Sequence, residues 1–159
     1  MKENQKLGAV ALGLGVLLFV PLLLAMVYIG VEAFGMRVSE SGNAFDILRD
    51  MGEADDFLFT MTGIFSVITM IVAVAMIVMG VLLLIDQQTD FLKKHYKIST
   101  IVAASVGLLT GLFALLFAVT YGETISGMGT YAKVGIGAIL LLVVGAAGIA
   151  QAFILGKKE

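Results

Sequence analysis

The chain has 159 residues, of which 60% are hydrophobic and 14% are charged, and its formal net charge is −2. Soluble domains carry about 25% charged residues, so this composition excludes an ordinary soluble domain. Cysteine is absent, which excludes disulfides and thiolate metal sites.

Four long stretches carry no charged side chain, and each is long enough to cross a bilayer. A hydrocarbon core about 30 Å thick needs about 20 apolar helical residues. The stretches therefore predict four transmembrane helices, over residues 7–31, 57–85, 98–122 and 134–156. Pro21 cannot donate a backbone hydrogen bond, so a bend is expected in the first helix. The whole chain, 1–159, is expected to form a single all-α, four-helix membrane domain.

The first polar loop, residues 32–56, is predicted to contain a short amphipathic helix. Asn43 is a good N-cap, and Asp46 three residues later resembles the acidic partner of a capping box. Such a helix either closes the bundle or offers a docking surface to a partner. The candidate docking residues are Phe45, Leu48, Arg49 and Asp50.

Hydroxyl side chains recur along one face of the second span, at Thr62, Ser66 and Thr69. A polar stripe of this kind can line a pathway through the membrane. Alternatively, the hydroxyls bond to carbonyl groups one turn back and serve as small packing residues. Gln151 is the only side-chain amide within a span, and an interhelical hydrogen bond there would contribute about 0.6–2 kcal/mol.

Small residues recur along one face of the third span and of the fourth span. Helices associate in lipid through close backbone approach, which small side chains permit. A short connection makes these two spans antiparallel neighbours, so we expect their small faces to touch, although another protein chain could also occupy them. The predicted helix-packing residues are Ala103, Gly107, Gly111, Ala114, Ala118, Ala138, Gly145, Gly148 and Ala152.

The basic residues predict the orientation of the chain in the membrane. Four spans place both termini on one side, together with the second loop, residues 86–97. Seven of the ten Lys and Arg residues lie on that side. Positively charged segments are retained in the cytoplasm during insertion. Both termini and the loop 86–97 are therefore expected to be cytoplasmic, in a multi-pass protein of the cell (plasma) membrane whose loop 32–56 is external.

Residues that support chemistry or transport are missing from the four spans. Ion and proton pathways normally need ionisable groups inside the membrane, and none of the spans has one. No phosphate-binding loop, paired nucleophile and base, or zinc motif occurs. We therefore expect no enzymatic activity, no cofactor and no metal, and no nucleic acid partner.

The layout resembles that of the tetraspan membrane proteins of the claudin type. Both termini are inside, the first external loop is long, the second is short, and the third helix is rich in small residues. The W-GLW motif and the two cysteines of that family are absent here. The resemblance therefore implies a layout and no residue roles.

A faint internal similarity relates the first and third spans. The stretches "KLGAV … VYIGVEAFGM" and "KISTIV … VTYGETISGM" each begin at a lysine and end at a Gly-Met pair. They indicate either a parallel repeat about an axis normal to the membrane or a coincidence in a glycine-rich sequence.

Two hypotheses for the function follow from these features. The leading one is a non-catalytic tetraspan protein, either an accessory or assembly subunit of a membrane complex or a self-associating structural protein. Its partners would be the lipid bilayer and either a membrane protein or further copies of the chain. The alternative is a small channel or transporter that forms by oligomerisation and uses the hydroxyl stripe.

Overall fold

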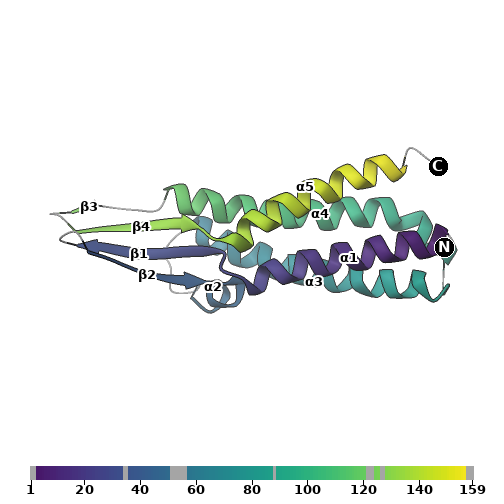
Figure 1. The fold of residues 1–159 in the computed structure, drawn as a ribbon, viewed down its shortest axis with the longest axis horizontal. Helices are drawn as coiled ribbons and strands as arrows, with labels where there is room; N and C mark the ends of the chain where they lie inside the picture. The colour runs from purple at the N-terminus through teal and green to yellow at the C-terminus, as the bar shows by residue number, and fades with distance from the viewer. Residues whose placement is uncertain are drawn as a thin grey trace.

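Four long helices form an antiparallel bundle with a small β-sheet at one end (Figure 1). The structure is a computed structural model that describes residues 3–33, 36–50, 57–87, 89–120, 124–125 and 128–156. All four helices are long and apolar enough to cross a membrane, which confirms the predicted four-helix membrane fold. They are α1 (Glu3–Leu23), α3 (Phe57–Leu84), α4 (Thr89–Thr120) and α5 (Ile136–Gly156).

The sheet was not predicted from the sequence. It has four antiparallel strands in the order β2-β1-β4-β3. The two central strands pair Val27 with Val134 and Ala33 with Met128, which joins segments far apart in the chain. The strands are β1 (Val27–Ala33), β2 (Met36–Gly42), β3 (Thr124–Ile125) and β4 (Met128–Val134). The sheet projects from the bundle at the end opposite to both termini (Figure 1).

Two predicted boundaries were wrong because a charge-free run is not the same as a helix. The first helix was expected to reach Val31, but α1 ends at Leu23, shortly after Pro21, and the rest of the run forms β1. The loop 86–97 is also shorter than expected, since α4 begins at Thr89 and carries its lysines in its first turns. Asp86 makes the tight turn with a left-handed φ of 56°, a conformation that aspartate tolerates.

The strand order does not follow the internal similarity between the first and third spans. A parallel repeat would place β1 and β3 in equivalent positions. In the structure β1 is central and β3 lies at an edge. The sheet instead relates β1 to β4, which pair with each other.

Helix pairs α1–α3 and α4–α5 make the most extensive contacts in the bundle, and α3–α4 joins the two pairs. The core runs along the bundle axis and includes the fully buried side chains of Leu18, Leu22 and Leu141. Large apolar side chains also cover the outer surface, for example Leu17, Ile71 and Val143, which are 54–63% exposed. Such a surface is suited to contact with lipid acyl chains rather than water.

The sheet is attached to the bundle by close backbone contacts at the ends of α1 and β4. The N–H groups of Gly135 and Gly137 donate to the carbonyl oxygens of Met26 and Ala25, each at 2.9 Å. A Cβ atom at Gly135 would overlap the Ala25 carbonyl, so this approach requires glycine. The first and last spans therefore meet where they leave the bundle.

Candidate functional site

The short helix predicted in the first polar loop is present as α2 (Ala44–Asp50). The Asp46 N–H donates to the Asn43 side-chain oxygen at 3.0 Å, and the Asn43 N–H donates to the Asp46 carboxylate at 3.1 Å. These reciprocal bonds satisfy two donors at the helix start. The predicted capping box is therefore confirmed.

One face of α2 packs on the bundle and the other is exposed. Ile47 is 1% exposed and anchors the helix, and α2 contacts α3. Ile47 was not among the residues that the sequence analysis singled out in this helix, whereas Phe45 and Leu48 were named as docking candidates. Leu48 is partly buried, whereas Phe45 is 47% exposed. An aromatic side chain therefore stands on the outer face of a helix that Ile47 holds in place.

Charged groups surround Phe45 on the outer face of α2. The Arg49 guanidinium donates to the Asp50 carboxylate at 3.1 Å and lies 3.6 Å from Asp46. The hydrogen bond with Asp50, together with the negative charges of Asp50 and Asp46, raises the pKa of Arg49. Since the pairs are exposed to solvent, they contribute little to stability. Arg49 remains a cation available to a partner.

Strand β2 leads directly into α2 and forms one edge of the sheet. The backbone groups on the outer side of an edge strand can pair with another chain. Glu40 and Ser41 are exposed near the end of this strand. Together with the outer face of α2 they form what we call the α2–β2 surface, made of Glu40, Ser41, Phe45, Arg49 and Asp50.

The small residues predicted to pack helices are all buried within the bundle. A Cβ atom at Gly111 would lie 2.8 Å from the Ala138 carbonyl oxygen, and one at Gly145 would lie 2.8 Å from that of Ala104. The small faces of α4 and α5 therefore lie against each other, and Gly107 lies against Leu18 of α1. The buried set comprises Ala103, Gly107, Gly111, Ala114, Ala118, Ala138, Gly145, Gly148 and Ala152.

A second close helix contact, between α1 and α3, was missed by the sequence reasoning. A Cβ atom at Gly8 would lie 2.8 Å from the Gly80 carbonyl oxygen, and one at Gly15 would lie 2.7 Å from that of Ala73. Gly8 and Gly15 are seven residues apart, a spacing that places them on one helix face. This spacing was the available signal.

The hydroxyl stripe of α3 is buried and serves packing. Thr62, Ser66 and Thr69 are at most 1% exposed, and each donates a 2.7 Å hydrogen bond to the carbonyl oxygen one turn back. The Thr69 hydroxyl also lies 2.7 Å from the Thr110 hydroxyl of α4. The packing interpretation of the stripe is therefore the one that the structure supports.

The amide of Gln151 makes the interhelical hydrogen bond considered in the sequence analysis. Its Nε2 donates to the hydroxyl oxygen of Tyr96 at 2.8 Å, which joins α5 to α4. Tyr96 is 5% exposed, and Gln151 is partly buried. It ties these helices together at the end of the bundle away from the sheet.

The α2–β2 surface is a polar surface outside the bundle, formed by described residues of α2 and β2. Within the described part of the chain, no three His, Asp or Glu side chains are grouped so that they could hold a metal ion. Comparison of the chain with protein-family models, with curated proteins and with solved structures found no match.

Proposed function

We propose that this four-span membrane protein is a non-catalytic accessory or assembly subunit, which binds a protein partner of a membrane complex through the α2–β2 surface. The observation that carries the proposal is the outer face of α2. It presents an exposed aromatic ring, Phe45, beside an exposed cation, Arg49, on a helix anchored by Ile47. Aromatic and arginine side chains are enriched among the residues that dominate binding energy at interfaces.

The packing of the bundle supports this location for the partner. The small faces of α4 and α5 are in contact within one chain, so they are not free to bind a second chain. The remaining outer surface of the helices is apolar and matches lipid. The α2–β2 surface combines an aromatic side chain, charged side chains and β2, which is an edge strand of the sheet among the described residues.

The proposal places the sheet outside the cell and both termini in the cytoplasm of a plasma-membrane protein. Lys6, Lys93, Lys94 and Lys97 lie at the end of the bundle opposite the sheet, as the retention of positive charge in the cytoplasm requires. The absence of native cysteine makes a labelling test simple. A cysteine at the exposed Ser41 should react with an impermeant thiol reagent in intact cells, and one at the exposed Gln87 should not. The opposite labelling pattern would reverse the orientation.

The docking proposal is tested by purifying the protein from its own membrane in mild detergent and measuring the mass of the complex. The double variant Phe45→Ala and Arg49→Glu should lose a partner that the wild-type protein retains in fixed ratio. Phe153→Ala is the matched control, since Phe153 is 52% exposed and lies on α5 at the other end. Retention of the partner by the double variant would contradict the proposed surface. A complex made only of copies of this chain would favour self-association instead.

The channel alternative rested on the hydroxyl stripe of α3. In the structure, those hydroxyls donate hydrogen bonds to carbonyl oxygens of their own helix, and the Thr69 hydroxyl also contacts the Thr110 hydroxyl. No observation on the described residues therefore favours it over the docking proposal.

A further inference from the structure

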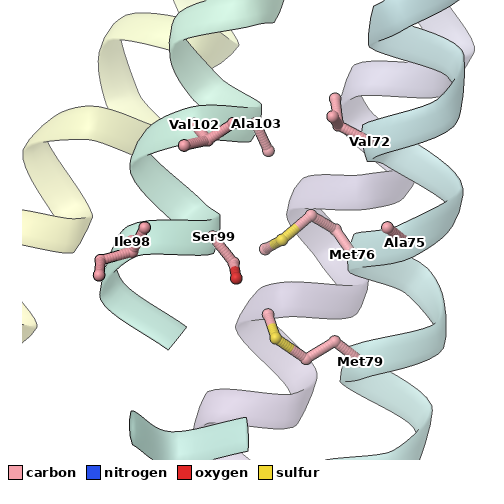
Figure 2. A pocket seen from close by; sticks show the side chains of 8 residues that line it. All are labelled: Val72, Ala75, Met76, Met79, Ile98, Ser99, Val102 and Ala103. Carbon is pink, nitrogen blue, oxygen red and sulfur yellow. The ribbon is translucent and has the colours of Figure 1, made fainter. Parts of the chain in front are cut away.

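Figure 2 shows a cleft between α3 and α4. Its lining residues belong to the half of the bundle away from the sheet. Its volume is about 250 Å³. Its walls are apolar except for the hydroxyl of Ser99, and the side chains of Met76 and Met79 point into it from α3. The cleft is thus a space between two helices that are otherwise packed together.

The cleft begins where the close contacts between α3 and α4 end. Nearer the sheet, the rings of Phe65 and Phe113 lie 5.1 Å apart and the hydroxyls of Thr69 and Thr110 are in hydrogen-bond contact. In the following turns no such pair bridges the helices, and Ala103 is one of the facing side chains. Beyond the cleft, α3 ends at Leu84 and α4 begins at Thr89.

The cleft opens on the outer surface of the bundle. Met76 and Ala103 form its floor and are 2% and 1% exposed. Ile98 and Val102 form one rim and are 64% and 49% exposed, and Ala75 on the opposite helix is also exposed. Since this surface of an apolar helix bundle faces lipid, the cleft is accessible from the membrane.

An alkyl chain is the material that fits this cleft. Water would find the Ser99 hydroxyl and almost no other polar partner, and a stable buried water needs two to four partners. An empty cleft would deprive its walls of dispersion contacts. Methionine side chains adapt their shape to an irregular apolar neighbour. The acyl chains of the surrounding lipid therefore match the cleft in chemistry and location.

Lys94 lies one helical turn before Ile98, on the face of α4 that forms the outer rim of the cleft. Side chains on a helix lean toward its N-terminus. The N-terminus of α4 is the end nearest the membrane surface, so the Lys94 stem can lie along apolar groups while its ammonium group reaches the lipid head groups. Lys94 is thus placed to contact the head group of a lipid molecule whose acyl chain lies in the cleft.

The neighbouring lysines on α4 have other contacts. Lys93 lies 3.8 Å from the carboxylate of Glu3, and the Lys97 ammonium lies 5.5 Å from the centre of the Phe153 ring. Lys94 is exposed and forms no salt bridge with the described residues. Its charge is therefore available to a phosphate group.

We propose that the α3–α4 cleft binds one acyl chain of a membrane phospholipid and that Lys94 holds the phosphate of the same molecule. This binding site is separate from the α2–β2 surface and does not depend on the proposed docking function. A bound lipid completes the packing of α3 against α4 in the half of the bundle where protein side chains leave them apart.

Native mass spectrometry of the purified protein, titrated with dioleoyl-phosphatidylglycerol in detergent, tests this proposal. Wild-type protein should retain one lipid molecule with a defined affinity. Ala75→Leu fills the mouth of the cleft and should abolish that retention, whereas Ala146→Leu places the same side chain at an exposed alanine of α5 and should not. Lys94→Gln should weaken binding about fivefold, the effect of one lysine at an anionic membrane surface. Lys6→Gln, at the same end of the bundle, should not.

Three results would overturn the proposal. The first is equal lipid retention by Ala75→Leu and Ala146→Leu. The second is a wild-type dimer that Ala75→Leu converts to a monomer, because a second copy of the chain would then occupy the cleft. The third is equal retention, by wild-type protein, of phosphatidylglycerol and of a diacylglycerol with the same chains and no phosphate. This last comparison needs no variant, so it decides the question even if Ala75→Leu fails to fold.

Discussion

The contact between α1 and α3 depends on Gly15, and a matched pair of substitutions can measure how closely the two helices approach. A Cβ atom at Gly15 would lie 2.7 Å from the Ala73 carbonyl oxygen and 2.9 Å from the Ile77 backbone nitrogen. At Gly13, on the same helix, an added Cβ would meet nothing within 4 Å. Alanine at either position changes the sequence in the same way, but only Gly15→Ala pushes against a neighbouring backbone.

The expected difference in stability follows from these distances. Gly→Ala in a helix interior is favoured by about 1 kcal/mol through intrinsic propensity, and this contribution is shared by the two variants. Inserting a group into a well-packed contact costs about 1–3 kcal/mol. Because backbone atoms cannot rotate away, Gly15→Ala should have a free energy of unfolding about 1–3 kcal/mol below that of Gly13→Ala. For a chain of this length the midpoint of thermal unfolding should differ by about 2–12 °C.

Circular dichroism at 222 nm during heating in a mild detergent measures this difference, with both variants purified identically. Gly13→Ala should unfold at or above the wild-type temperature, and Gly15→Ala at or below it. If Gly15→Ala were as stable as Gly13→Ala, the helices would have room for a methyl group at this position. The close backbone approach of α1 and α3 would then be refuted.

Three further predictions use the same thermal measurement. Asn43→Ala removes the N-cap of α2 and should cost about 0.5–2 kcal/mol, whereas Asn43→Ser should recover most of it; equal stability of both variants would contradict the role of the cap. Tyr96→Phe removes the hydroxyl that accepts from Gln151 and should lower the free energy of unfolding by about 0.6–2 kcal/mol. In a protein that already carries Gln151→Leu, the same change should have a much smaller effect, and an equal effect in both backgrounds would contradict the hydrogen bond. Gly135→Ala should destabilise the protein by more than 1 kcal/mol because its methyl group would overlap the Ala25 carbonyl; a neutral effect would show that the sheet junction can relax.

Local signals were sufficient to predict the helices. The spans are long and apolar, and the start of α2 depends on Asn43 and Asp46, which are three residues apart. Such short-range patterns can be read directly from a sequence. The predicted docking residues Phe45, Arg49 and Asp50 are exposed on α2, but the anchoring role of Ile47 depends on contact with α3 and was not foreseen.

Strand β1 was missed because most of it lies inside an apolar run. In β1, the β-branched residues Val27, Ile29 and Val31 occupy every second position, which is the period-two pattern of a strand. The run from Leu7 to Val31 is longer than the roughly 20 residues that a span needs, and the surplus was assigned to the helix. Pairing of β1 with β4 is also a long-range contact, which no local pattern specifies.

The short connections from α1 to β1 and from β4 to α5 have a mechanical consequence. The two central strands are hydrogen-bonded to each other, and the junction is fixed by the bonds from Gly135 to Met26 and from Gly137 to Ala25. A sideways force on the two central strands is therefore transmitted through these bonds to the ends of α1 and α5. We therefore expect the two central strands, α1 and α5 to tilt together about this junction.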